Sequence, residues 1–247
     1  RCFKISFNVI NKIYMKVIIL CGGLGSRLAE ETTKKPKPMV EIGGIPIIRH
    51  IMGIYSQFGY KDFILAAGYK AEYIENYFKK KIFGLNIKVI NTGRNTLTGG
   101  RLLRLKKLFK KNDNFMLTYG DGLSSQNIKK LVKFHLSHKK IGTLTAVHPP
   151  VRFGELKINK DKVKLFQEKP QSKTSWINGG FFVFNYDIFD FIKGDKTMLE
   201  KEPLQKLAKS NQLHAYKHNG FWQCMDTMRD KIFLNNLVKS KNIPWKK

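Results

Sequence analysis

The stretch that decides the fold runs from Met15 to Met39 and reads MKVIILCGGLGSRLAEETTKKPKPM. Its apolar run over residues 17–20 ends abruptly in glycines, which is typical of a buried parallel strand followed by a tight turn. The glycines at 22, 23 and 25 let backbone N–H groups approach a ligand closely, and bare amides suit phosphate oxygens. Arg27 and Lys37 add positive charge suited to phosphate. The stretch predicts either a phosphate-binding loop or a strand-to-helix turn without a ligand.

Two common phosphate motifs do not match this stretch. A P-loop needs Gly, four residues, then Gly-Lys-Ser/Thr, and the sequence contains no such run. The dinucleotide-binding fingerprint needs a third glycine at the position that Leu28 occupies. Any phosphate site here is therefore of another kind.

Length and composition indicate a globular domain. The chain has 247 residues, of which 42% are hydrophobic, enough for a sizeable core. No apolar run reaches the roughly 18–20 residues that span a bilayer. The three cysteines, Cys2, Cys21 and Cys224, lack metal-ligand spacing. Such sparse cysteines favour a reducing compartment, so we expect a cytoplasmic protein.

The formal net charge of +28 has two interpretations. It could attract nucleic acid or a membrane surface, or it could reflect lysines on solvent-exposed faces. The lysines are spread along the chain, without a polybasic tail or a basic aromatic stripe. We therefore expect neither nucleic acid nor a membrane as partner. We expect the positive field of the protein to attract anionic substrates.

Apolar runs alternate with helical patterns after the glycine loop. Residues 63–67 and 87–90 are expected strands, and residues 46–58 and 71–81 are expected helices. This alternation predicts an α/β fold with a doubly wound, mostly parallel, Rossmann-like sheet, whose ligands bind beyond the carboxyl ends of the strands. Residues 1–14 are expected to be a disordered or non-native extension before one domain over 15–247.

The pattern changes in the second half of the chain. Residues 155–158 and 163–166 are expected to form an antiparallel pair within a small lobe. We therefore divide the domain into a part with alternating strands and helices, 15–152, and a part with successive strands and a C-terminal helix, 153–247. His135 and His138 could share a face of a helix over 126–138, but no third ligand lies near them and we do not expect a metal there.

Two aspartates are candidate metal ligands. Asp121 lies between glycines after an expected strand over 115–119, and Asp226 precedes Thr227 and a helical pattern. Each has a structural alternative, since Asp121 could be a turn residue and the Asp-Thr pair could cap the helix. Mg²⁺ usually takes one or two carboxylates plus substrate phosphates, so each aspartate is a candidate ligand for Mg²⁺. Asp230 is the weaker candidate because it would lie on the helix.

Several segments together resemble the sugar-phosphate nucleotidyltransferases. The resemblance rests on CGGLGSRL and KPKPMV of the first stretch, and covers roughly residues 15–245. The segments Thr92-Gly93, TGGRL at 98–102, PPVRFG at 149–154, EKP at 168–170 and NGG at 178–180 are similar to those of the cytidylyltransferase members. The family joins a nucleoside triphosphate to a sugar 1-phosphate on a nucleotide-diphospho-sugar transferase fold. The resemblance implies that residues 15–152 are the nucleotide-binding part and residues 153–247 the sugar-binding part, with the small antiparallel lobe at the sugar.

The resemblance implies roles for individual residues. Arg27 and Lys37 would act on the phosphates, Arg101 would meet the triphosphate, and Asp121 and Asp226 would bind Mg²⁺. The implied nucleotide-binding residues are Leu20, Cys21, Gly22, Gly23, Leu24, Gly25, Ser26, Arg27, Thr96, Gly99, Gly100, Arg101 and Gly120. The implied sugar phosphate-binding residues are Glu168, Lys169, Asn178 and Gly179.

The implied reaction transfers a cytidylyl group from CTP to α-D-glucose 1-phosphate, giving CDP-glucose for deoxysugar and lipopolysaccharide precursors. UTP, dTTP or another sugar 1-phosphate are alternatives, as are a basic nucleic-acid-binding protein and a catalytically silent regulatory homologue. The link between Phe78 and Ile87 is shorter than the insertion of the cytidylyltransferases. This departure leaves base selectivity and homo-oligomerisation open.

Overall fold

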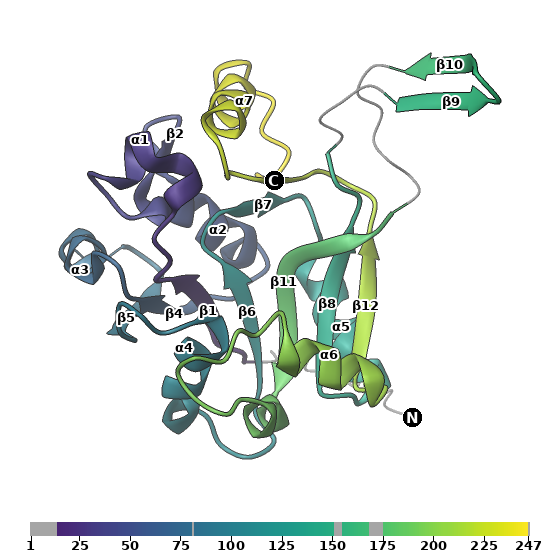
Figure 1. The fold of residues 1–247 in the computed structure, drawn as a ribbon. Coiled ribbons are helices and arrows are strands. Elements are labelled where there is room, and N and C mark those ends of the chain that lie inside the picture. Colours follow the sequence, from purple (N-terminus) through teal and green to yellow (C-terminus); the bar gives the residue numbers. More distant parts are fainter. Residues whose placement is uncertain (1–13, 81, 151–154, 168–174, 247) are drawn as a thin grey trace, which may run out of the picture.

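The computed structural model describes residues 14–80, 82–150, 155–167 and 175–246 and is built on one seven-stranded sheet (Figure 1). The strand order is β12-β8-β11-β6-β1-β4-β5. The strands are β1 (Val17–Cys21), β4 (Asp62–Ala67), β5 (Asn86–Asn91), β6 (Asn114–Tyr119), β8 (Gly142–Val147), β11 (Ile177–Asn185) and β12 (Leu213–His218). Only β11 runs antiparallel to its neighbours, so the predicted mostly parallel α/β sheet is confirmed.

The central strand β1 explains why its sequence shows no polar alternation. Ile19 lies opposite Leu65 on β4 and Thr118 on β6, and all five residues of β1 are buried. Because successive side chains of a strand point to opposite faces, Ile19 enters one hydrophobic core and Ile18 enters the other. Both faces of the sheet are covered, as parallel sheets require.

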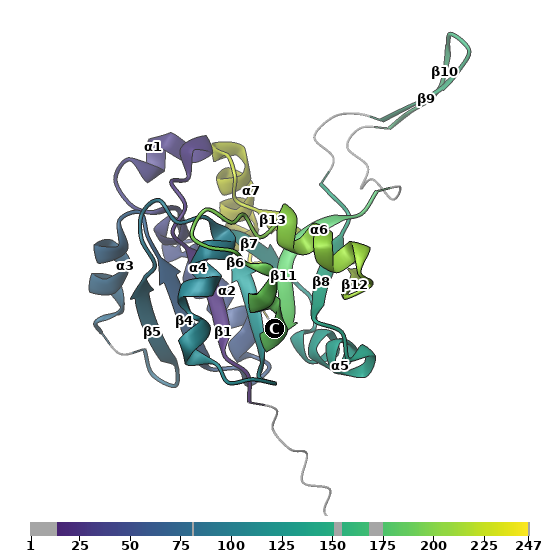
Figure 2. The ribbon, with the colours of Figure 1, turned by 60° about the horizontal axis from the view of Figure 1, so that its bottom comes forward.

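Helices form the two outer layers (Figure 2). Buried side chains of α2 (Ile47–Ser56), α3 (Ala71–Phe78), α5 (Ile128–His138) and α7 (Met228–Lys239) belong to the core that contains Ile19. Those of α4 (Thr98–Arg104), the 3-10 helix η4 (Tyr186–Phe191) and α6 (Glu202–Lys209) belong to the core that contains Ile18. No helix in the described ranges is both long and apolar enough to cross a membrane.

Short elements connect these layers. They are η1 (Ser26–Leu28), α1 (Ala29–Thr32), η2 (Lys37–Met39), β2 (Glu41–Ile42), β3 (Ile45–Pro46), η3 (Lys106–Leu108), β7 (Gly122–Ser124) and β13 (Trp222–Cys224). The antiparallel β7–β13 pair places Cys224 opposite Gly122, next to the end of β6. Gly122 and Cys224, about 100 residues apart in the sequence, therefore meet just beyond the carboxyl end of β6.

The second half of the chain contains the small lobe and also extends the main sheet. The predicted antiparallel pair is present as β9 (Glu155–Asn159) and β10 (Lys162–Gln167). However, β11 returns to the main sheet between β6 and β8, and β12 extends that sheet beyond β8. The expected helix over 126–138 begins at Ile128, because the Asn127 side chain accepts a hydrogen bond from the Lys130 amide and caps it. The chain after β5 forms α4 followed by η3.

The sheet topology predicts where a ligand binds. The chain moves from β1 outward to β4 and β5, then crosses back to β6 on the other side of β1. The loops that follow β1 and β6 therefore leave the sheet in different directions, which opens a crevice at their carboxyl ends. The glycine loop and Asp121 lie at this switch point.

Candidate active site

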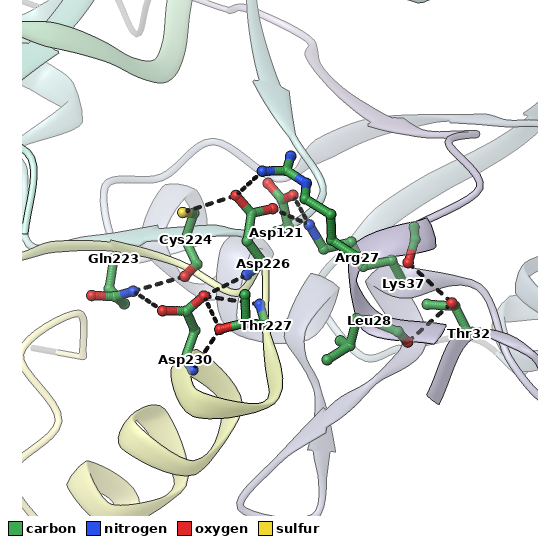
Figure 3. Close-up of polar contacts among 11 residues, drawn as sticks. Arg27, Leu28, Thr32, Lys37, Asp121, Gln223, Cys224, Asp226, Thr227 and Asp230 are labelled. Carbon is green, nitrogen blue, oxygen red and sulfur yellow. Dashed lines mark hydrogen bonds and ion pairs between the residues drawn. The ribbon is translucent and has the colours of Figure 1, made fainter. Parts of the chain in front are cut away.

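The glycine loop after β1 is held in a defined shape. Gly25 has a φ of +67°, a left-handed conformation that glycine adopts without strain. Its carbonyl oxygen accepts hydrogen bonds from the Leu28 amide at 2.9 Å and from Thr32 Oγ1 at 3.1 Å. The Thr32 hydroxyl also contacts the Leu28 carbonyl at 3.0 Å (Figure 3). The loop is therefore preformed, and Arg27 stands on its outer side.

Lys37 and two aspartates form a compact charged cluster (Figure 3). The Lys37 ammonium lies 2.5 Å from Asp121 Oδ2 and 2.6 Å from Asp226 Oδ1, and Arg27 lies 3.0 Å from Asp226 Oδ2. The Lys37 side chain is 12% exposed, whereas that of Arg27 is 72% exposed. The two carboxylates therefore converge on one buried cation, with a second cation at the surface.

The pKa shifts in this cluster agree with its geometry. Burial alone would lower the pKa of the Lys37 ammonium, but the two aspartates raise the pKa above its usual value. Burial opposes the charge of Asp226, yet its bonds to Lys37 and its proximity to Arg27 lower the pKa of that carboxyl. Both groups are charged at neutral pH, so the cluster is a salt-bridge network rather than a proton relay.

Helix capping explains why Asp226, and not Asp230, faces Asp121. Thr227 is the N-cap of α7 and forms a capping box with Asp230. Asp230 Oδ2 accepts from the Thr227 amide at 2.9 Å and from the Asp226 amide at 3.0 Å. Asp230 is thus occupied by the helix start, and the Asp226 side chain is left to point into the site.

Two carboxylates that share one cation also fit a divalent metal ion. Asp121 and Asp226 could hold such an ion together with phosphate oxygens, which is how Mg²⁺ is commonly bound. The described part of the chain contains no group of three or more His, Cys, Asp or Glu side chains arranged for metal binding. A metal at this site would therefore depend on the substrate for its remaining ligands.

Backbone carbonyl oxygens hold the Arg101 side chain in place. Its side chain is buried, and its terminal nitrogens donate to the carbonyl oxygens of Gly22 at 2.8 Å, Gly93 at 2.7 Å and Ala67 at 3.1 Å. A Cβ atom on Gly22 would lie 2.1 Å from the guanidinium. Arg101 lines the cavity and also ties together the loops after β1, β4 and β5, and its contact with a triphosphate stays a prediction.

Gly99 and Gly100 also differ from the expected free amides. Both donate to the Thr197 carbonyl oxygen, at 3.0 and 3.2 Å. A Cβ atom on Gly100 would lie 2.4 Å from the Asp195 carbonyl oxygen. These glycines therefore permit close packing against the loop that precedes α6, and neither lines the cavity.

The charged cluster lies in a cavity of about 530 Å³. Of the residues expected from the sequence, the cavity is lined by Leu20, Cys21, Gly22, Gly23, Gly25, Ser26, Arg27, Lys37, Thr96, Arg101, Gly120, Asp121, Asn178, Gly179 and Asp226. Leu24 is exposed and does not line it. Glu168, Lys169 and the end of the 149–154 turn lie outside the described residues. The structure thus brings most of the expected residues to one cavity.

The cavity wall contains two residues that sequence reasoning missed as site residues. Tyr119, the last residue of β6, and Thr98 both line it, and both donate to Glu200. Trp222, which the sequence leaves open as either a substrate-stacking or a core residue, also lines the cavity, and its indole Nε1 donates to the Gly179 carbonyl oxygen at 2.7 Å. The Trp222 hydrogen bond holds the NGG segment in place. No local motif marks Glu200, because its partners are 81 and 102 residues away.

A glycine-rich loop and cation-paired aspartates at the switch point of a parallel sheet define a nucleotide-handling enzyme of the nucleotidyltransferase class. The chain belongs to the nucleotidyl transferase family, whose sequence model matches residues 16–232. It is 47% identical, over 254 aligned residues, to the glucose-1-phosphate cytidylyltransferase of Salmonella typhimurium, covering 94% of this chain and 99% of that one. The predicted family is confirmed.

Two further relatives agree with this assignment. The probable glucose-1-phosphate cytidylyltransferase of Bacillus subtilis is 39% identical over the same shares of the two chains. The crystal structure of HddC from Yersinia pseudotuberculosis has a TM-score of 0.73 at 26% identity, covering 91% of this chain and 99% of that chain. The protein is thus a nucleotidyltransferase with the fold of the nucleotide-sugar enzymes, as predicted.

Proposed function

We propose that this protein transfers a cytidylyl group from CTP to α-D-glucose 1-phosphate, giving CDP-glucose and pyrophosphate. The observation that carries the proposal is the charged cluster of Lys37, Arg27, Asp121 and Asp226 beside the glycine loop. The choice of base and sugar follows the two relatives that are named as glucose-1-phosphate cytidylyltransferases. The product would serve deoxysugar and lipopolysaccharide precursor synthesis in the cytoplasm.

The chemistry needs no nucleophile from the protein. A phosphate oxygen of glucose 1-phosphate attacks the α-phosphorus of CTP, and the bond from that phosphorus to the departing pyrophosphate oxygen breaks. Catalysis then consists of in-line positioning and charge neutralisation. The site supports this view, because it offers two cations, a preformed loop and two carboxylates within one cavity.

Each residue has a proposed task. The glycine-loop amides and Arg27 hold the triphosphate, and Lys37 neutralises charge at the α-phosphate. Asp121 and Asp226 hold Mg²⁺, which supplies positive charge on the phosphate oxygens. Members of this family generally use a divalent metal ion. Glu168 and Lys169 are proposed to bind the sugar phosphate, together with Asn178 and Gly179 in the cavity wall.

Pyrophosphate release tests the proposal directly. The purified protein is given glucose 1-phosphate, Mg²⁺ and, in turn, CTP, UTP, dTTP, ATP or GTP. Release with CTP well above the other nucleotides is expected. Release with UTP or dTTP instead would retain the chemistry and overturn the base assignment. Absence of release with every nucleotide, from a protein whose circular dichroism shows native folding, would overturn the proposed sugar substrate.

A further inference from the structure

Glu200 lies outside the active-site cavity and is hydrogen-bonded to residues of two of its walls. It lies between η4 and α6, in the loop that packs against the start of α4. Its Oε2 accepts a hydrogen bond from Thr98 Oγ1 at 2.6 Å, and its Oε1 accepts one from the Tyr119 hydroxyl at 2.6 Å. Thr98 and Tyr119 both line the cavity, whereas Glu200 does not. One carboxylate therefore joins two cavity-facing hydroxyls.

The directions of these hydrogen bonds are fixed by the other partners of each hydroxyl. Thr98 Oγ1 accepts from the Leu199 amide at 2.9 Å, so its own proton is free for Glu200. The Tyr119 oxygen accepts from Asn178 Nδ2 at 3.4 Å and gives its proton to Glu200. Both hydroxyls therefore donate, and only a group with two acceptor oxygens satisfies both. A carboxylate does so, whereas an amide would turn its NH₂ group toward one donor.

The pKa of Tyr119 is consistent with this arrangement. Burial raises the pKa of the phenol above its usual value, and the charge of Glu200 raises it further. The phenol therefore keeps its proton and remains a hydrogen-bond donor over the whole physiological pH range.

The two hydroxyls that donate to Glu200 lie in walls of the cavity that face different substrates. On one side, Thr98 lies next to Thr96 and Leu97 in the wall that the resemblance assigns to the nucleotide. On the other side, the Tyr119 ring lies so close to Gly180 that a Cβ atom there would be 2.4 Å from the ring. Asn178 Oδ1 accepts from the Gly180 amide at 2.9 Å, so Tyr119 supports the NGG segment of the sugar side.

We propose that Glu200 is a positioning residue. It fixes the distance and orientation between the cavity wall at Thr98, which faces the nucleotide, and the cavity wall at Tyr119, which faces the sugar. This inference rests on the proposed function, because it assigns the two walls to two substrates. An in-line transfer depends strongly on the alignment of its reacting atoms, and a misplacement of about 1 Å can cost about 100-fold in rate. A single acceptor shared by both walls is suited to hold that alignment.

Three variants separate the two hydrogen bonds of Glu200. Thr98→Val removes the hydrogen bond on the nucleotide side, Tyr119→Phe removes the one on the sugar side, and Glu200→Gln disturbs both. We expect Thr98→Val to raise the KM for CTP and Tyr119→Phe to raise the KM for glucose 1-phosphate, each about tenfold, as for a lost buried hydrogen bond to a charged group. Glu200→Gln should raise both KM values and also lower kcat. A purely structural role would lower the melting temperature without this split.

A matched control and a binding measurement complete the test. Glu202→Gln changes the same kind of side chain two residues away, where the carboxylate pairs with Lys193 and Lys206 at the surface. It should leave both KM values unchanged. Binding of CTP alone, measured by calorimetry, should weaken in Thr98→Val and Glu200→Gln but not in Tyr119→Phe.

The outcomes distinguish this inference from the proposed function. A folded Glu200→Gln variant that keeps both KM values and kcat, or that raises only one KM, would overturn the positioning role while the wild type still transfers the cytidylyl group. If Glu200→Gln does not fold, Thr98→Val and Tyr119→Phe provide the test. The inference would be overturned if each of these variants changed the KM for CTP and the KM for glucose 1-phosphate equally. A wild type that binds CTP but releases no pyrophosphate would contradict the proposed function, and the calorimetric arm would still test the nucleotide side.

Discussion

Replacing Lys37 with methionine should let a divalent metal ion bind without nucleotide. In the structure the Lys37 ammonium contacts both Asp121 and Asp226, so it occupies the position on which the two carboxylates converge. The four charges of Lys37, Arg27, Asp121 and Asp226 sum to zero, since two cations oppose two anions. Without Lys37 the sum is −1, and the space between the carboxylates is open to another cation.

The size of the effect follows from Coulomb's law. A unit charge 4 Å from another contributes about 4 kcal/mol at an effective dielectric constant of about 20. The side chains of Lys37 and Asp121 are 12% and 25% exposed, so water screens part of this interaction. We therefore expect a net gain of about 1.5–3 kcal/mol in metal binding, which corresponds to an affinity about 10- to 150-fold higher.

Titration with Mn²⁺ in the absence of nucleotide measures this gain, with free Mn²⁺ followed by electron paramagnetic resonance. Lys35→Met is the matched control, because it removes the same charge from a lysine whose partner is Glu41 at 3.4 Å. Adding Asp226→Asn to Lys37→Met should abolish the gain. If Lys37→Met binds Mn²⁺ no better than Lys35→Met and the wild type, Lys37 does not compete with a metal, and the reasoning is refuted.

Three further predictions concern catalysis, packing and pH. Asp121→Asn should lose at least about 100-fold in pyrophosphate release while its circular dichroism stays native, because charge neutralisation and metal binding both depend on it; retained turnover would exclude Asp121 from the machinery. Arg101→Met should lower the free energy of unfolding by about 3 kcal/mol, measured with urea, because it deprives buried carbonyl oxygens of their charged donor; an unchanged midpoint would contradict its tying role. Burial lowers the pKa of His135 from 6.5 to about 4 in the folded protein, with a smaller effect of His138. The unfolded chain therefore binds a proton first as pH falls, and stability is lost between pH 6.5 and 4, by about 3 kcal/mol. His135→Gln should remove this part of the pH dependence of urea unfolding, and parallel pH profiles of the two proteins would count against it.

Local sequence sufficed where each residue's role depends on its chain neighbours. The apolar run of β1 and the glycines after it predicted a buried strand and a tight turn, because strand burial and positive φ are local properties. The sequence also favours Asp226 over Asp230, and Asp226 is the one of the two that lines the cavity. Its reason is a capping box within four residues, which sequence patterns encode.

Residue type and spacing are least informative where hydrogen-bond partners come from distant segments. The resemblance implies that Arg101 and Gly100 bind the nucleotide, and an arginine and a glycine at a helix start offer donors for it. In the fold, the donors of Arg101 meet the carbonyls of three loop ends, and the Gly100 amide meets Thr197, 97 residues later. A donor's partner is decided by packing, so residue type and spacing alone could not distinguish a substrate ligand from a structural tie.

By itself the sequence determined the alternation of strands and helices in the first half of the chain, the glycine loop and the family of the enzyme, because these depend on periodicity and on short continuous motifs. Only the tertiary structure decided that Lys37 lies between Asp121 and Asp226, which are 84 and 189 residues from it. It also decided that Glu200 joins two cavity walls and that β11 completes the main sheet. The physical reason is that a charged or hydrogen-bonded pair acts over a few ångströms of space, whatever the length of chain between its members.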